Sequence, residues 1–139
     1  DAETDQYLTM AIARIELETG IVDICQAGHP SPALQKLLGD VTFLELWSTP
    51  LGLIEEGEYA TTSIRLKPGD RVMLYSDGVT ECPDTDGSML DEEGLEAILA
   101  SSTNLSGSEL VDHLTNRLTT YRGSDDFPDD VSAVIIEFR

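Results

Sequence analysis

Asp77 and Asp129 are the two acidic residues whose positions in the sequence best suit chemistry. Asp77 and Gly78 end the apolar segment 72–76, and Asp129 precedes the apolar segment 131–138. A carboxylate placed where a buried strand stops is costly unless something pairs with it. If the two strands are neighbours in a sheet, both carboxylates lie at the same edge, and oxygen ligands of this kind suit magnesium or manganese. A water molecule bound to such an ion would be the nucleophile for hydrolysis of a phosphate ester.

Simpler interpretations stay open for these residues. Asp77 and Gly78 can form a turn, and Asp129 can be an ordinary loop acid, because aspartate is common in turns. His29 follows Gly28 in a loop that contains two prolines. It is either a general acid or base, which needs a partner that the sequence does not show, or a structural residue.

Other known site motifs fit poorly. Residues 82–93 match four positions of the EF-hand calcium loop, but Cys82 and Pro83 occupy the first two positions and a strand precedes them. We therefore interpret this segment as a solvated loop. The sequence contains no GxSxG, Walker or GxGxxG motif.

The composition narrows the class of partner. The 139 residues include 8 basic and 27 acidic side chains, a formal net charge of −19. Such a charge repels nucleic acid and anionic lipid, and it suits a divalent cation or a basic partner. No apolar run approaches the length of a membrane span, and we expect a cytoplasmic protein. Cys25 and Cys82 are expected to be reduced thiols, with a disulfide between them as the alternative.

The pattern of apolar residues predicts an α+β domain with a mostly antiparallel sheet and helices on one face. Residues 7–27 read as a β-hairpin, and the apolar half of its first strand predicts a strand covered on both faces. The predicted strands are residues 7–17, 21–27, 33–38, 41–47, 59–66, 71–76 and 131–138.

Two helices are predicted between the last two strands. Asp91 can cap the first, whose inner face would be Leu95, Ile98 and Leu99. The second begins at Ser106, which forms a capping box with Glu109. A hydrophobic staple and a buried stripe are expected from Leu105, Leu110, Val111, Leu114 and Leu118.

Four blocks of sequence, in this order, resemble the SpoIIE-type branch of the bacterial metal-dependent protein phosphatases, the PPM or type 2C family. They are AGHPSP at 27–32, PLGL at 50–53, LKPGDRVMLYSDGVTE at 66–81 and DDVS at 129–132. The resemblance covers nearly the whole chain. It implies a four-layer α-β-β-α sandwich, in which two stacked sheets lie between helical layers.

The resemblance also implies an activity and a site. Serine or threonine would be dephosphorylated by water activated between two manganese or magnesium ions, in substrates such as phosphorylated anti-sigma-factor antagonists of bacterial stress signalling. Asp77 from the SDG block and Asp129 from the DDV block would be metal ligands. Gly28 and His29 would line the site without binding metal. Gly78 and Asp130 are further candidates for lining it, and Asp130 occupies a position where relatives often have asparagine.

The chain departs from the family pattern in one respect. Nothing in residues 1–139 matches the upstream Gly-Asp-rich metal motif or the Asp-x-x-Gly-x-Gly stretch. We therefore expect residues 1–139 to be a single-domain segment, the C-terminal part of the phosphatase domain. The bridging aspartate would lie upstream, and the same polypeptide can carry an upstream sensor or receiver domain. The isolated chain is expected to bind manganese weakly and to hydrolyse little p-nitrophenyl phosphate.

Two functions follow as hypotheses. The first is an enzyme, the C-terminal half of a manganese-dependent phosphatase in a bacterial signalling pathway. The alternative is a catalytically degenerate, phosphatase-like binding module. Retention of both Asp77 and Asp129 favours the enzyme, because a binding module has no need of costly carboxylates.

Overall fold

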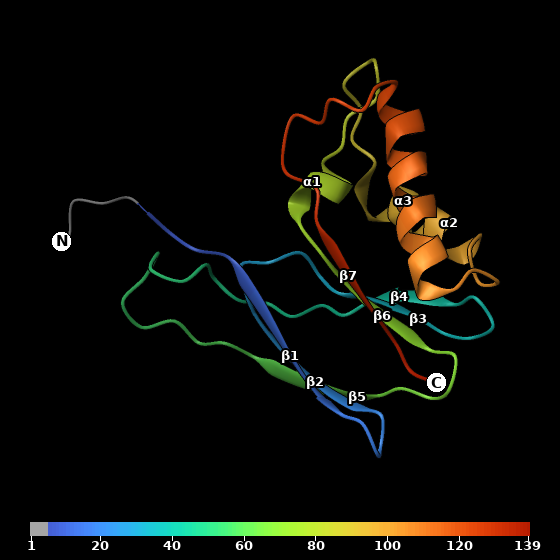
Figure 1. Ribbon diagram of the computed structural model, residues 1–139. Coiled ribbons are helices and arrows are strands. Elements are labelled where there is room, and N and C mark those ends of the chain that lie inside the picture. Colours follow the sequence, from blue (N-terminus) through green and yellow to red (C-terminus); the bar gives the residue numbers. More distant parts are fainter. Residues whose placement is uncertain (1–5) are drawn as a thin grey trace.

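The chain folds as two antiparallel β-sheets with helices on one side (Figure 1). The structure is a computed structural model that describes residues 6–139. A three-stranded sheet has the order β1-β2-β5, and a four-stranded sheet has the order β4-β3-β6-β7. Their bounds are β1 Met10–Glu16, β2 Ile21–Ala27, β3 Ala33–Gln35, β4 Val41–Phe43, β5 Thr61–Arg65, β6 Arg71–Tyr75 and β7 Ala133–Glu137.

Three helices belong to the described residues: α1 (Asp77–Thr80), α2 (Asp91–Ala100) and α3 (Gly107–Arg122). Helices α2 and α3 cover the face of the four-stranded sheet that points away from the other sheet (Figure 1). No helix within residues 6–139 has both the length and the apolar character needed to cross a membrane. The expected α+β class, with antiparallel sheets and helices outside them, is confirmed.

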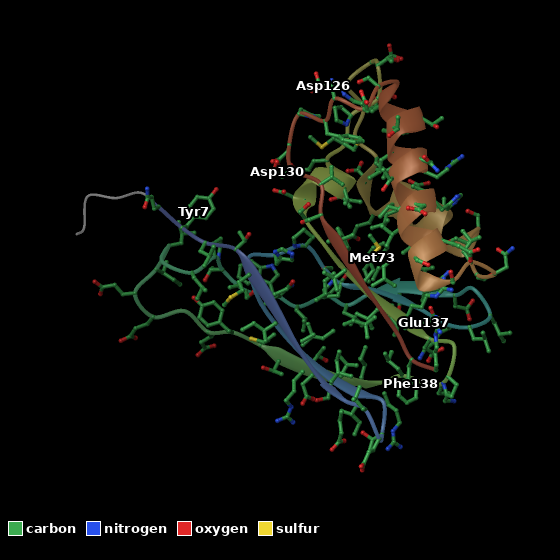
Figure 2. All side chains as sticks on the ribbon, viewed as in Figure 1. Tyr7, Met73, Asp126, Asp130, Glu137 and Phe138 are labelled. Carbon is green, nitrogen blue, oxygen red and sulfur yellow. The ribbon has the colours of Figure 1, made fainter. Side chains whose placement is uncertain are left out.

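Strand β6 is buried on both faces, because its side chains alternate between two cores. Val72 points into the core between the sheets, where it meets Val22 and Ile24 of β2. Met73 and Tyr75 point into the core beneath the helices, and Figure 2 labels Met73 there. This second core is completed by buried residues of α2 and α3, namely Leu95, Ile98, Leu99, Leu110, Leu114 and Leu118.

The predicted hairpin is present, but its first strand is not covered on both faces. Strands β1 and β2 pair in register from Met10 with Ala27 to Glu16 with Ile21. Ile12 is 55% exposed, because it lies on the face opposite Ala13, which packs against the core between the sheets. The apolar pattern indicated a strand correctly but could not indicate which of its faces is covered. Cys25 and Cys82 are both free, as expected.

The two long helices largely follow the predicted pattern. The capping box is confirmed: the Ser106 amide donates to Glu109 at 2.7 Å, and the Glu109 amide donates to the Ser106 hydroxyl at 3.4 Å. Two details are wrong. Val111 is 41% exposed and lies outside the buried stripe, and Asp91 is the first residue of α2 rather than its side-chain cap.

Buried polar side chains of the four-stranded sheet hold the connection between α2 and α3. Arg71 of β6 donates to the carbonyl of Ser102, at 3.3 Å, and to that of Leu105. Gln35 of β3 donates to the carbonyl of Leu99 at the end of α2. These bonds tie the end of α2 and the connection that follows it to strands β3 and β6, and so hold both helices over the sheet.

Asp70 joins two turns at the end of the sheet opposite α1. It is only 3% exposed, and its carboxylate accepts hydrogen bonds from the Lys67 amide (2.9 Å), the Leu37 amide (3.1 Å) and the Lys36 ammonium (3.0 Å). Burial raises the pKa of Asp70, but the bonds from Lys67, Lys36 and Leu37 outweigh it, so the pKa lies below its ordinary value.

We expect Asp70→Asn to lower the free energy of unfolding at pH 7 by roughly 1–3 kcal/mol, because one acceptor oxygen is replaced by an amide group that faces donors. Since the folded pKa is depressed, the contribution of the ionised carboxylate is complete above the unfolded pKa of about 3.9 and is lost as the pH falls through the folded pKa. The difference between wild type and variant should therefore shrink below about pH 4.

Urea unfolding at pH 7, 5 and 3 measures this difference. The control is Asp40→Asn, an exposed carboxylate near the same turn, which should change the stability by less than about 0.5 kcal/mol. An equal effect of Asp70→Asn at pH 3 and pH 7 would show that its charge does not stabilise the fold.

Candidate metal centre

Strand β6 carries the chain to the candidate site. Its last residue, Tyr75, is buried, and the Tyr75 hydroxyl donates to the Ser31 carbonyl at 2.7 Å. Burial, with a smaller contribution from the Glu92 carboxylate, raises the pKa of Tyr75, so the phenol stays a neutral donor. The chain then leaves the sheet at Ser76, and α1 begins at Asp77. The alternative of a simple turn at this position is wrong.

Helix α1 brings a second carboxylate beside Asp77. The amide of Glu81 donates to the carbonyl of Asp77 at 2.8 Å, so one helical turn separates the two residues. Residues four apart lie on the same side of a helix, and their side chains can reach the same point. The sequence contains this spacing, but its pattern predicts no helix here and so does not indicate Glu81 as a site residue.

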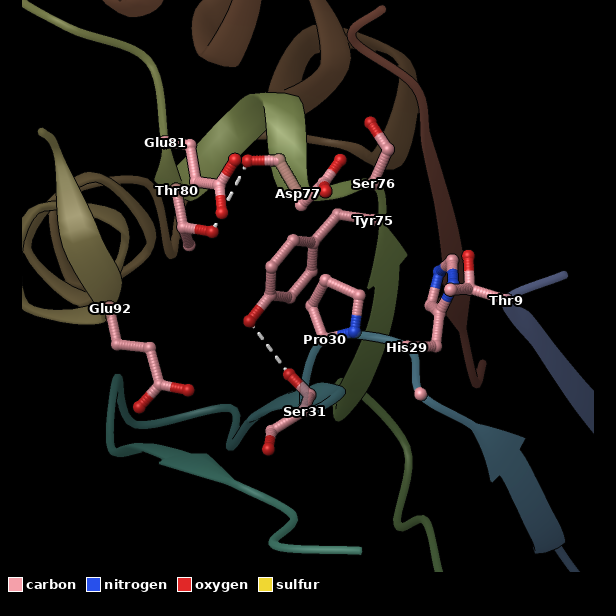
Figure 3. A pocket seen from close by; sticks show the side chains of 11 residues that line it. Thr9, His29, Pro30, Ser31, Tyr75, Ser76, Asp77, Thr80, Glu81 and Glu92 are labelled. Atoms are coloured by element: carbon pink, nitrogen blue, oxygen red, sulfur yellow. Dashed lines mark hydrogen bonds between the residues drawn. The ribbon is translucent and has the colours of Figure 1, made fainter. Parts of the chain in front are cut away.

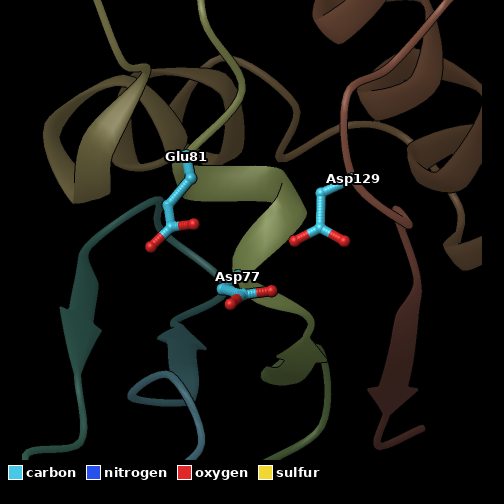
Figure 4. Close-up of side chains that lie close together, drawn as sticks. All are labelled: Asp77, Glu81 and Asp129. Atoms are coloured by element: carbon cyan, nitrogen blue, oxygen red, sulfur yellow. The ribbon is translucent and has the colours of Figure 1, made fainter.

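Three carboxylates meet in front of α1. Oxygen atoms of Asp77, Glu81 and Asp129 all lie within 4.8 Å of one another, and all three residues are exposed. Figure 4 shows Asp77 between the other two, with Asp129 reaching in from the segment that precedes β7. One oxygen of Asp129 accepts a hydrogen bond from the amide of Asp130 at 2.7 Å, which orients this carboxylate.

Strands β6 and β7 explain why Asp77 and Asp129 meet. The two strands are antiparallel neighbours, and Tyr75 is paired with Ala133 at the end of their ladder. Each carboxylate lies a few residues beyond this pair. As expected, β6 and β7 are neighbours and the two carboxylates lie at the same end of these strands. Strand β7 is at the edge of its sheet.

Gly78 allows the two segments to approach closely. A Cβ atom at this position would lie 2.2 Å from the carbonyl oxygen of Asp130 and 3.5 Å from that of Asp129. No real side chain tolerates the shorter distance, so only glycine fits without moving the backbone. Gly78 is buried, and the contact forms because it has no side chain. Asp130 takes part in the contact through its backbone carbonyl.

The donor set suits a small divalent cation. Two oxygens bound to one magnesium ion lie at most about 4.2 Å apart, twice the metal–oxygen distance, so small side-chain rotations would close the cluster on an ion. None of the ion pairs formed within residues 6–139 involves Asp77, Glu81 or Asp129. The mutual repulsion of the three carboxylates is therefore not offset by a protein cation, and a metal ion would relieve it.

A cavity of about 470 Å³ adjoins the carboxylates. Asp77 and Glu81 lie on one side of it, and His29 and Glu92 of α2 lie on opposite sides of Tyr75 (Figure 3). The Nδ1 atom of His29 is buried and finds no hydrogen-bond partner among residues 6–139. The structure thus brings Gly28 and His29 to the same cavity as Asp77, whereas Gly78 and Asp130 do not line it.

Comparison with known proteins identifies the family. The family described as stage II sporulation protein E (SpoIIE) matches residues 1–139. The chain is 27% identical over 132 residues to the phosphoserine phosphatase RsbU of Bacillus subtilis, which covers 91% of this chain and 39% of RsbU. It therefore spans well under half of that relative.

Solved structures share the fold. The SiaA-PP2C domain of Pseudomonas aeruginosa aligns with a TM-score of 0.82 at 16% identity, over 94% of this chain and 51% of that one. The manganese-presoaked phosphatase domain of SpoIIE from Bacillus subtilis aligns with a TM-score of 0.70 at 20% identity, over 94% of this chain and 56% of that one. The fold is that of PP2C-type phosphatase domains, and the match over residues 1–139 shows that this chain belongs to the SpoIIE family.

Proposed function

We propose that residues 1–139 form the C-terminal part of a metal-dependent serine/threonine phosphatase domain. The observation that carries this proposal is the meeting of Asp77, Glu81 and Asp129, which form no ion pair with a cation of the described chain, beside a cavity of about 470 Å³. Membership of the SpoIIE family supports the same conclusion.

Asp77 and Asp129 are the proposed metal ligands, and Glu81 is a third candidate on the same side of α1. When manganese or magnesium is bound, it lowers the pKa of a water molecule and so provides a nucleophile for the phosphate ester. The remaining ligands of a two-ion site are proposed to lie upstream, where the family resemblance places them; the chain covers only 39% of RsbU.

The proposed substrate is phosphoserine or phosphothreonine in a bacterial regulatory protein of the anti-sigma-factor antagonist type. The relative RsbU is named a phosphoserine phosphatase, which supports this class. The cavity walls include Asp77, Glu81 and Glu92, which repel a phosphate dianion until bound cations offset their charge. His29, on another wall, offers a ring nitrogen to the phosphate group.

We expect Asp77→Asn and Asp129→Asn each to reduce manganese-dependent hydrolysis of a phosphoserine peptide by about 100-fold or more, because each removes a charged ligand. The assay uses the intact phosphatase that contains this chain. The matched control is Asp125→Asn, an exposed loop acid outside the cluster, which should retain wild-type activity. Unchanged activity in both ligand variants would remove the proposed mechanism.

Glu81→Gln tests whether Glu81 is a third metal ligand beside Asp77 and Asp129. If Glu81 shares the ion, its neutral variant should need a manganese concentration about 10-fold higher for half-maximal activity, with a smaller change in the maximal rate. A titration of activity against manganese separates the two parameters. A wild-type titration curve would restrict the ligands in this chain to Asp77 and Asp129.

Asp77→Asn should also raise the thermal stability of the metal-free chain, by about 2 °C, because it removes one of three carboxylates that repel one another. Manganese should raise the melting temperature of the wild type and leave that of the variant nearly unchanged, since a ligand stabilises only the state that binds it. Scanning calorimetry with EDTA and with manganese measures both effects. A clear loss of metal-free stability would instead assign Asp77 a structural role at the start of α1.

A further inference from the structure

Ser76 lies between the last residue of β6 and the first candidate ligand, and it makes three hydrogen bonds to one segment. Its hydroxyl donates to the carbonyl of Asp130 at 2.9 Å and accepts from the amide of Ser132 at 2.9 Å. Its own amide donates to the carbonyl of Ser132 at 2.9 Å. One side chain therefore joins the β6–α1 junction to the segment that carries Asp129.

The bonds of the Ser76 hydroxyl lie just beyond the end of the β6–β7 ladder, where few backbone bonds hold the segment with Asp129. The ladder between β6 and β7 ends at the pair Tyr75 and Ala133. Beyond it, one more backbone bond joins the Ser76 amide to the Ser132 carbonyl, and α1 then turns away from the sheet. The Ser76 hydroxyl supplies both a donor and an acceptor at this point, as a continuing strand would.

Asp130 connects the Ser76 hydroxyl to the carboxylate of Asp129. Ser76 holds Asp130 by its carbonyl, and the amide of Asp130 donates to the Asp129 carboxylate at 2.7 Å. Gly78, on the other side of Asp77, permits the close contact with the same carbonyl of Asp130. Asp77 is thus flanked by two residues that set the place of the opposite ligand.

We propose that Ser76 is a positioning residue of the metal centre, whose hydroxyl sets the separation of Asp77 and Asp129 and thereby the affinity for a divalent ion. The inference rests on the proposed function, because it takes these two carboxylates as ligands. It assigns Ser76 no contact with the metal or the substrate. Residues that orient metal ligands typically change metal affinity by about 10–100-fold when they are mutated.

The test is manganese binding by the intact phosphatase that contains this chain, followed by the loss of the electron paramagnetic resonance signal of free Mn²⁺. Ser76→Ala should weaken the affinity by about 10-fold, and Ser76→Cys, of similar size but with weaker hydrogen bonds, should weaken it as well. Ser76→Thr keeps the hydroxyl and should restore wild-type affinity. The control is Ser102→Ala, which removes a buried hydroxyl bonded to the Leu99 carbonyl far from the carboxylates and should bind manganese like the wild type.

The outcomes separate this inference from the proposed function. If Asp77→Asn abolishes binding while Ser76→Ala and Ser76→Cys bind like the wild type, the metal centre stands and the role of Ser76 is wrong. If the wild type binds no more manganese than Asp77→Asn does, the proposed centre fails and the inference fails with it. A thermal melt without metal accompanies each variant. An affinity loss that follows the melting temperature, and appears equally in Ser102→Ala, would reduce Ser76 to a general structural residue.

Discussion

The backbone of Gly78 lies against the carbonyl of Asp130, and the candidate site depends on this contact. A Cβ atom at Gly78 would come within 2.2 Å of that oxygen, so any other residue would push the segment with Asp129 away from α1. Val79, the next residue, is fully buried beneath α2 and α3 and fixes the short helix from the other side. A helix of one turn has little stability of its own. Its place is set by these two contacts.

The scaffold is built to hold a group of charges that repel one another. Strand β6 lies between two cores, and buried Arg71 and Gln35 tie the helices to the sheet through backbone carbonyls. These contacts lie in the interior, whereas Asp77, Glu81 and Asp129 are exposed at its edge. Packing in the interior thus offsets the repulsion among the three carboxylates, which lowers the free energy of unfolding. Functional sites often reduce stability in this way.

Much of this architecture can be predicted from the sequence, because it depends on local patterns. The hairpin follows from two apolar segments and a turn with Gly20, and the start of α3 follows from Ser106 and Glu109. The nearness of Asp77 and Asp129 follows from two apolar segments that each end in an acid, once the segments are taken as neighbours.

Other features lie beyond local patterns. Helix α1 has only four residues, one of them glycine, so the sequence shows no helical periodicity there. Without a predicted helix, nothing in the sequence places Glu81 beside Asp77. The exposure of Ile12 and Val111 depends on which elements cover them, and composition does not contain that information. The part played by Asp130 was also hidden, since it acts through its carbonyl rather than its side chain.

The central claim is that Asp77 and Asp129 share one divalent ion. Anomalous X-ray diffraction from a crystal of the chain soaked in manganese tests it most directly, because the signal locates the metal without reference to activity. The account predicts an anomalous peak with oxygens of both carboxylates about 2.1 Å away, within the usual range for a hard divalent ion. A fully soaked crystal with no peak between them, or with manganese bound only at other acidic groups, would contradict it.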